Sequence, residues 1–342
     1  MSLGEEKREQ ILSGKNLSES HRKLALGWNV LSAIAVILFL SAIGIWYFFF
    51  SAKPLDWSVS EEGLLSYSPR GGIIYSEALV SSEGDTLLKI EFESRGTTVH
   101  GLLRIPKIAG EAGTGTNETG GDASIGASSG VPGIVLLPGA GVTKEGEQKV
   151  ASELARMGYA SLTIDQRGIG ESKEKVGDLN SNYEIFLRGK EPPVYEMIHD
   201  ALRAYDLLRE RHEIDSGRIF FMGESMGGRT AIIAAALEPR ARGAVGISTG
   251  GYGLGGAVVK NNLTLFQKSI DPDAYIGMIA PGKVLMIHSK RDDVVGIENA
   301  RRTYVGASEP KRFVEVDCNT HGYCVEMKEE LGDGLAWIVS GS

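Results

Sequence analysis

The chain has 342 residues and a formal net charge of −8, with 45 glycines, two cysteines and six histidines. An acidic balance of this size argues against a nucleic-acid-binding surface. The cysteines and the scattered histidines form no cluster with metal-ligand spacing, so we expect neither a metal nor another cofactor. This length suits one large domain or two small ones.

An uncharged, largely apolar stretch near the N-terminus predicts a membrane anchor at residues 28–50, with tryptophan and tyrosine near its ends. The stretch is longer than the roughly 7–15-residue core of a signal peptide, so we expect it to stay uncleaved. More lysines and arginines precede it than follow it. This asymmetry predicts a single-pass protein of the cell membrane, with residues 1–27 in the cytoplasm and the folded domain outside it.

The region after the anchor is expected to begin with a linker and to contain one large insertion. Residues 51–84 contain Gly, Ser and Pro and predict a linker beside the membrane, so that the folded domain covers residues 85–342. Within that domain, residues 109–131 are rich in Gly, Ala, Ser and Thr. This composition predicts a flexible surface insertion.

Strand and helix patterns alternate along the rest of the domain, after a hairpin expected to turn at Arg95-Gly96. Such alternation is typical of an α/β fold, a mostly parallel sheet with helices on both faces. In chain order, we expect strands Leu87–Glu93, Thr97–Pro106 and Gly133–Leu137, a helix near Glu145–Met157, strand Ala160–Asp165, a helix near Val194–Arg209, strand Arg218–Met222, a helix ending at Leu237, and strand Lys283–Ile287.

The run Gly223-Glu224-Ser225-Met226-Gly227 carries the strongest functional signal. It lies between an apolar strand and a strong helix former, which is the context of a nucleophile elbow. Its glycines avoid collisions at a strained turn. The same G-x-S-x-G pattern surrounds Ser128 and Ser248, but Ser225 has the required strand and helix, which leaves Ser248 as the main competitor. The alternative is a glycine-rich turn that merely packs tightly.

A nucleophilic serine needs a base, and the base needs an orienting acid. In a strand-turn-helix site of this kind, the chain order is serine, acid, histidine. His321 follows both the serine and a later acid, so we expect it to be the general base. For the acid, Asp292 and Asp293 both fit, and the strand before them and the two valines after them favour Asp292. The alternative is a solvated turn paired locally with Arg291.

An acyl-transfer site also needs N–H donors for the oxyanion. One donor is expected at Met226, the residue after the nucleophile. The other is expected in the loop Pro138-Gly139-Ala140-Gly141, where Ala140 is the best candidate and Gly139 and Gly141 remain possible. These glycines also suit a tight turn without any catalytic role.

Two further features surround the expected site. Cys318 and Cys324 bracket His321, so outside the cell a disulfide could hold this loop and contribute about 2 kcal/mol, while two free buried thiols are equally compatible. Residues 172–196 and 250–281 are irregular insertions expected above the strand ends. They are small lids and pocket walls or ordinary surface loops.

Over residues 85–340, the chain resembles the α/β-hydrolase superfamily. The motifs that carry the resemblance, in order, are Pro138-Gly139-Ala140-Gly141, the D-x-R-G-x-G-x-S run Asp165–Ser172, the Ser225 elbow, and the pair Asp292 and His321. Ile214–Ile219 is similar to the branch of dienelactone hydrolases, acyl-peptide and prolyl peptidases and related esterases. The chain departs from many relatives in one respect, because Pro138 stands where they carry histidine.

The resemblance implies an α/β-hydrolase fold and a serine hydrolase that works through an acyl-enzyme. A small-molecule carboxylic ester is the favoured substrate. A peptidase, a thioesterase or an acyltransferase would use the same triad. A non-catalytic ectodomain on this scaffold is the alternative from another functional class.

Overall fold

The computed structural model describes residues 34–43, 56–107, 130–172 and 176–341. The chain divides into two compact units, Met1–Asp56 and Trp57–Ser342. In the first unit, residues 34–43 form a helix with exposed side chains.

Most of the anchor expected at residues 28–50 lies outside the described residues, as does the segment 1–27. Among the helices that are described, none has both the length and the apolar character needed to cross a bilayer. The membrane-spanning helix is therefore unconfirmed.

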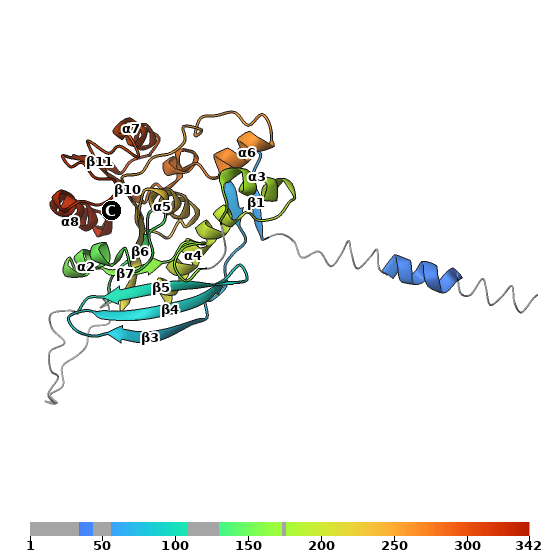
Figure 1. Cartoon of the computed structure of the whole chain (residues 1–342), viewed down its shortest axis with the longest axis horizontal. Coiled ribbons are helices and arrows are strands. Elements are labelled where there is room, and N and C mark those ends of the chain that lie inside the picture. The colour runs from blue at the N-terminus through green and yellow to red at the C-terminus, as the bar shows by residue number, and fades with distance from the viewer. Residues whose placement is uncertain (1–33, 44–55, 108–129, 173–175, 342) are drawn as a thin grey trace, which may run out of the picture. The chain divides into compact units, whose positions relative to one another are not determined.

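The strands of the second unit are β1 (Trp57–Val59), β2 (Leu65–Tyr67), β3 (Tyr75–Ser81), β4 (Thr86–Ser94), β5 (Thr97–Ile105), β6 (Val131–Leu137), β7 (Ala160–Ile164), β8 (Ile214–Glu224), β9 (Gly243–Ile247), β10 (Lys283–Ser289) and β11 (Lys311–Val316). Most of them belong to one nine-stranded sheet. The order in the large sheet is β11-β10-β9-β8-β6-β7-β5-β4-β3, and β1 and β2 form a separate pair (Figure 1). The strands from β11 to β7 run parallel, while β5, β4 and β3 are antiparallel additions.

Helices cover both faces of the sheet, as expected. They are α2 (Gln148–Arg156), α3 (Leu179–Leu187), α4 (Pro193–Glu210), α5 (Met226–Leu237), α6 (Asn262–Ser269), α7 (Ile297–Val305), α8 (Lys328–Val339), and the 3₁₀ turns η1 (Pro272–Ala274), η2 (Ile276–Met278) and η3 (Val325–Met327). One core cluster joins the sheet to α4 and α5, and includes the stacked rings of Tyr205 and Phe221. The other joins it to α2 and α8, through Leu154 and Leu335.

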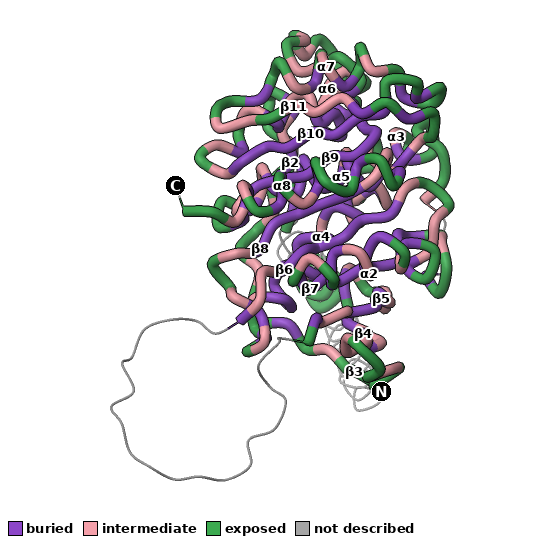
Figure 2. The backbone as a smooth tube through the Cα atoms, turned by 90° about the vertical axis from the view of Figure 1, so that its left-hand side faces the viewer, coloured by how far each residue is buried: buried purple, intermediate pink, exposed green. Residues whose placement is uncertain are grey.

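The central parallel strands β7, β9 and β10 are buried along their whole length, as is usual for parallel strands that helices cover on both faces (Figure 2). The hairpin of β4 and β5 is confirmed. Its two turn residues, Arg95 and Gly96, have φ values of 53° and 75°. Positive φ at both positions is typical of the type I′ turn that matches the twist of antiparallel strands.

The folded unit begins within the range that was expected to be a linker, residues 51–84. From Trp57 onward this range forms β1, β2 and β3. Trp57 and Leu65 are buried in the core, and the Leu65 N–H donates to the hydroxyl of Tyr275 at 2.7 Å. The strands are short and separated by Gly, Ser and Pro, so no period was visible in the sequence.

The two insertions that were expected above the strand ends contain helices. Residues 172–196 include α3, and residues 250–281 include α6 and two 3₁₀ turns. The third insertion, expected at 109–131, lies almost entirely outside the described residues.

Candidate active site

The expected catalytic residues follow strands of the parallel part of the sheet. Ala140 follows β6, Ser225 follows β8, Asp292 follows β10 and His321 follows β11. The carboxyl ends of parallel strands meet at one edge of a sheet, where ligands bind in open α/β folds. The topology therefore brings these four positions to the same edge.

Ser225 occupies the strained turn that the elbow pattern predicts. Its backbone has φ 50° and ψ −113°, a conformation that L-residues rarely adopt. A side chain at Gly227 would collide with the carbonyl of Leu137, and one at Gly223 would collide with the backbone of Gly227. The two glycines are thus required for the helix α5 to start this close to the strands.

Asp292 and His321 form a close pair. The Nδ1 atom of His321 lies 2.9 Å from Oδ2 and 3.0 Å from Oδ1 of Asp292. The carboxylate also accepts the backbone N–H groups of Val294 and Val295, each at 2.9 Å. An Nδ1–H donated to Asp292 leaves Nε2 as the basic nitrogen. Asp293, the other candidate acid, is exposed.

Asp292 is held in its ionised form by this environment. Burial by itself raises the pKa of the Asp292 carboxyl, but hydrogen bonds from Val295, His321, Val294 and Ser248 outweigh it, and the pKa lies below its ordinary value. An ionised carboxylate at this position fixes the histidine tautomer and stabilises an imidazolium.

The loop that carries His321 is fastened to the elbow. The Glu224 carboxylate, immediately before the nucleophile, accepts a backbone hydrogen bond from Tyr323. The Ser248 hydroxyl donates to the carbonyl of Gly322 at 3.4 Å. Cys318 and Cys324 form a disulfide, so a covalent bridge spans the same loop.

Ser248, the competitor for the nucleophile, has a different environment. It also has positive φ, 46°, but it is fully buried and does not line the pocket that contains Ser225. Its hydroxyl contacts the histidine loop and Asp292. Ser248 is therefore placed to support the acid and the base, a role that the sequence pattern did not suggest.

Two backbone N–H groups next to Ser225 are free to receive an oxyanion. Met226 and Ala140 line the same pocket as Ser225. Within the described part of the chain, the N–H of neither residue has an acceptor. A side chain built on Gly139 would lie 3.7 Å from the Ser225 Cβ, which places this loop beside the nucleophile.

Asp165 and Gln166, in the run Asp165–Ser172, contact the chain in and just after the loop Pro138–Gly141. The Asp165 carboxylate accepts the N–H of Lys144 at 2.8 Å and its buried ammonium at 2.7 Å. The Gln166 side chain donates to the Pro138 carbonyl at 2.6 Å. Within the D-x-R-G pattern, Asp165 therefore holds the chain just after the loop that contains Ala140, and Gln166 holds Pro138 in that loop.

The buried carboxyl of Glu147 lies near the half-buried carboxyl of Glu224, the residue before Ser225, and sequence reasoning missed both. Burial and the neighbouring Glu224 raise the pKa of Glu147 to about 8. Burial also raises the pKa of Glu224, against the hydrogen bond from Tyr323. Two adjacent carboxyls with little access to water cannot both ionise easily. Glu224 carried a signal, because it lies inside the elbow motif, whereas Glu147 carried none.

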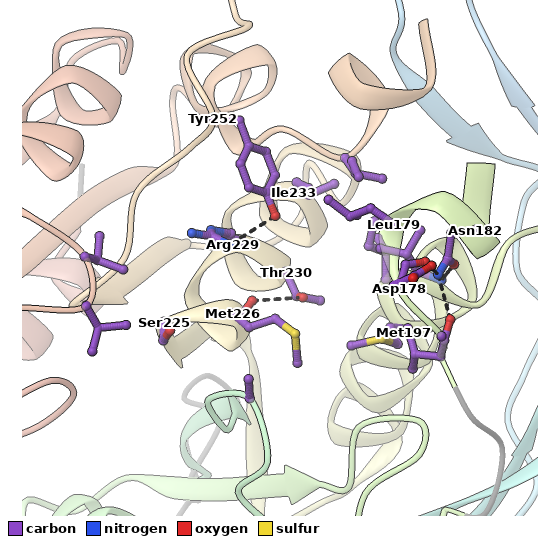
Figure 3. A pocket seen from close by; sticks show the side chains of 18 residues that line it. Asp178, Leu179, Asn182, Met197, Ser225, Met226, Arg229, Thr230, Ile233 and Tyr252 are labelled. Atoms are coloured by element: carbon purple, nitrogen blue, oxygen red, sulfur yellow. Dashed lines mark hydrogen bonds between the residues drawn. The ribbon is translucent and has the colours of Figure 1, made fainter. Parts of the chain in front are cut away.

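A pocket of about 420 Å³ opens beside Ser225 (Figure 3). Its walls are mostly apolar and come from α3, α4 and α5 with the chain after β9 and β10, including Leu179, Met197 and Ile233. The aromatic rings of Phe186 on α3 and Phe266 on α6 lie 5.5 Å apart. The insertions therefore pack against each other, and the 172–196 insertion forms a pocket wall.

One group of residues in the described ranges has metal-ligand spacing, and it consists of Cys318, Cys324 and Glu326. Its two sulfur atoms are joined in the disulfide. A bonded sulfur pair is not a thiolate ligand set, so we assign no metal to it.

Parts of this chain are similar in sequence to known proteins. A family profile described as serine aminopeptidase, S33, matches residues 132–271. YfhR of Escherichia coli O157:H7, an uncharacterized protein, is 24% identical over 176 residues, 50% of this chain and 56% of its own length. The putative hydrolase YtaP of Bacillus subtilis strain 168 is 37% identical over 90 residues, 26% of this chain and 29% of YtaP. The matches thus span little more than half of YfhR and less of YtaP.

Two solved structures share the fold. An acetyl xylan esterase from Paenibacillus sp. R4 superposes with a TM-score of 0.61 at 18% identity, over 78% of this chain and 89% of the other. A glucuronoyl esterase from Solibacter usitatus gives 0.58 at 14% identity, over 82% and 90%. These likenesses show that the chain has an α/β-hydrolase fold, and that residues 132–271 are similar to the serine aminopeptidase family, S33.

Proposed function

We propose that this enzyme hydrolyses carboxylic esters with Ser225 as nucleophile, His321 as general base and Asp292 as the orienting acid. The observation that carries the proposal is the 2.9 Å contact between His321 and Asp292, on a loop that is fastened to the turn of Ser225. A serine on a strained turn, a histidine and a buried ionised carboxylate are the parts of an acyl-transfer site.

The reaction proceeds through an acyl-enzyme. Ser225 Oγ attacks the ester carbonyl carbon while His321 Nε2 takes the hydroxyl proton, and the oxyanion accepts the N–H groups of Met226 and Ala140. Collapse breaks the carbon–oxygen ester bond, and the leaving alcohol receives the proton from His321. A water molecule then gives a proton to His321 and attacks the acyl carbon. The second collapse releases the acid and returns the proton to Ser225.

The pocket supports an ester of small or medium size as the substrate. Its volume of about 420 Å³ and its mostly apolar walls suit a short acyl or alcohol group. The two solved relatives named above are described as esterases. The matching family profile is described as an aminopeptidase, so amide cleavage is the alternative to test beside ester cleavage.

The proposal is tested by fluorophosphonate labelling of the full chain, beside Ser225→Ala and Ser248→Ala. We expect Ser225→Ala alone to abolish labelling. Hydrolysis of p-nitrophenyl esters of increasing chain length then sizes the pocket, and aminoacyl p-nitroanilides and acyl thioesters test the peptidase and thioesterase alternatives. Addition of an alcohol during ester hydrolysis detects acyl transfer. A folded wild type that is neither labelled nor active would contradict the proposal.

We also propose that residues 28–50 tether the enzyme to the cell membrane, with the N-terminus in the cytoplasm. The support is the long uncharged stretch and the excess of lysine and arginine before it. The expected result is that the full chain stays with membranes in alkaline carbonate, while a chain lacking residues 28–50 is released. Protease added to intact cells should digest the catalytic domain, and release of the full chain by carbonate would contradict the tether.

A further inference from the structure

Arg229 places a positive charge beside the nucleophile. Arg229 lies in the first turn of α5, and its backbone N–H donates to the Ser225 carbonyl at 3.2 Å. Ser225 is the N-cap of α5, about one turn before Arg229, and both residues line the same pocket. Among the described residues, Arg229 forms no ion pair with a carboxylate.

The guanidinium of Arg229 is fixed by uncharged groups. Its Nε donates to the Gly250 carbonyl at 2.8 Å, and its Nη1 donates to the Tyr252 hydroxyl at 3.0 Å. Its central carbon lies 4.6 Å from the centre of the Tyr252 ring. These contacts use two of the five N–H donors of the guanidinium and leave three for another acceptor. The Tyr252 hydroxyl, which accepts from Arg229, retains its own proton to donate (Figure 3).

The other polar side chains of the pocket are engaged within the protein. Thr230 donates to the Met226 carbonyl at 3.2 Å. Asn182 donates to the Val176 and Asp178 carbonyls and accepts the N–H of Val194. The Asp178 carboxylate caps α3 on the side of the pocket away from Arg229 (Figure 3). The charged donor that this pocket offers to a ligand beside Ser225 is therefore the guanidinium of Arg229.

We propose that Arg229 and Tyr252 bind a carboxylate of the substrate, so that the enzyme prefers esters that carry a negative charge a few carbons from the scissile bond. The inference rests on the proposed ester hydrolysis. A planar carboxylate matches the donor fork of a fixed guanidinium. The four-residue spacing on α5 corresponds to about 6 Å along the helix, the reach of a short dicarboxylic acyl chain.

The test compares monomethyl adipate with dimethyl adipate, an anionic and a neutral ester of the same chain. The values of kcat/KM are measured by methanol release for the full-length wild type and for Arg229→Met, Arg229→Lys and Tyr252→Phe. We expect the wild type to prefer the monoester. In Arg229→Met the ratio of monoester to diester should fall about 10-fold or more, the size of a lost charge-assisted hydrogen bond. Arg229→Lys should keep part of the preference.

Arg156→Met is the matched control, because Arg156 is an exposed cation on α2 outside the pocket. It removes the same charge and should leave the ratio as in the wild type. A second pair, butyryloxyacetate and its methyl ester, moves the carboxylate to the alcohol side. Discrimination in either pair that depends on Arg229 supports the proposal and tells which side of the ester carries the charge.

Fluorophosphonate labelling of each variant reports whether its active site is intact. If Arg229→Met fails to fold, two other measurements test the proposal. The ratio of kcat/KM for the monoester to that for the diester should be lower in Tyr252→Phe than in the wild type, and in the wild type it should fall as the salt concentration rises. The inference is overturned if the wild type prefers the neutral ester in both pairs. It is also overturned if Arg229→Met leaves unchanged the ratio of kcat/KM for the charged ester to that for the neutral ester. In both cases ester hydrolysis itself still stands. Absence of labelling and of all ester hydrolysis in the wild type would instead overturn the proposed function.

Discussion

The two sides of the active site are held in place by different interactions. On the catalytic side, Asp292 receives bonds from two backbone N–H groups and from His321, and a disulfide spans the histidine loop. On the pocket side, helices from two insertions meet through aromatic contacts, such as Phe186 with Phe266.

This difference separates the two properties expected of the proposed enzyme, its reaction rate and its selectivity among substrates. Directional hydrogen bonds and a covalent bridge fix reacting atoms within a fraction of an ångström, which transfer of a proton and an acyl group requires. Apolar packing fixes volume and tolerates substitution. Changes on the catalytic side should therefore lower kcat, and changes on the pocket side should shift selectivity among substrates.

The largest effect is expected for Asp292→Asn. An amide at this position favours the wrong histidine tautomer, and kcat should fall by roughly 10⁴-fold. Asp293→Asn is the matched control, because Asp293 is adjacent but exposed. The measurement is kcat for p-nitrophenyl butyrate. An equal loss in both variants, or a loss in Asp293→Asn alone, would contradict the assignment of the acid.

The next effect concerns the disulfide of the histidine loop. Replacing Cys318 and Cys324 together by serine should lower the free energy of unfolding by about 2 kcal/mol, the scale for a short closed loop. It should also lower kcat, because the base is then held less firmly. Urea titration of the double variant and of the wild type, each with and without dithiothreitol, measures the loss. If dithiothreitol changes neither the stability nor the activity of the wild type, the disulfide neither stabilises the fold nor holds the histidine in position.

On the pocket side, Leu179→Trp should change selectivity. Leu179 lies on α3, lines the pocket and is half exposed, so a larger side chain can enter the pocket without disturbing the core. The ratio of kcat/KM for p-nitrophenyl octanoate to that for the acetate should fall about tenfold, a difference of about 1.4 kcal/mol. Leu187→Trp, at an exposed position on the same helix outside the pocket, should leave the ratio unchanged. Equal ratios in the two variants would remove α3 from the substrate site.

The smallest effect is a pH dependence of stability. Because the pKa of Glu147 is raised from 4.5 to about 8, the folded state holds this proton more tightly than the unfolded chain. Its contribution is fully present below pH 4.5 and is lost as the pH rises through 8. Glu147→Gln should therefore flatten the fall in stability between these limits and be more stable than the wild type at the alkaline end.

Thermal and urea unfolding across this pH range test the prediction. Glu330→Gln, at an exposed carboxyl on α8, serves as the control and should keep the wild-type profile. If the stability of the wild type and that of Glu147→Gln change with pH in parallel, Glu147 does not hold a proton more tightly in the folded state.

Local patterns in the sequence predicted the elements from β4 to α5, with the exception of α3, and also β10. The hairpin of β4 and β5, the strands β6, β7, β8 and β10, and the helices α2, α4 and α5 form where expected, whereas β11, α7 and α8 were not predicted. The turn at Ser225 was also visible, because glycines at fixed offsets leave few alternatives. The strands β1 and β2 were missed because each has only three residues. Their buried side chains pack against residues that lie far away in the sequence.

The sequence by itself determined the order of the motifs, and with it the choice of His321 and the preference for Asp292. It left open Asp292 against Asp293, a disulfide against free thiols, and Ser225 against Ser248. The tertiary structure bears on these choices through burial and proximity, which depend on contacts between residues far apart in the chain. It also brought Glu147 close to Glu224 and, within the described ranges, placed Arg229 beside Ser225 with no ion pair to a carboxylate. Such charges acquire their chemistry from the groups that fold around them, and no local pattern records those groups.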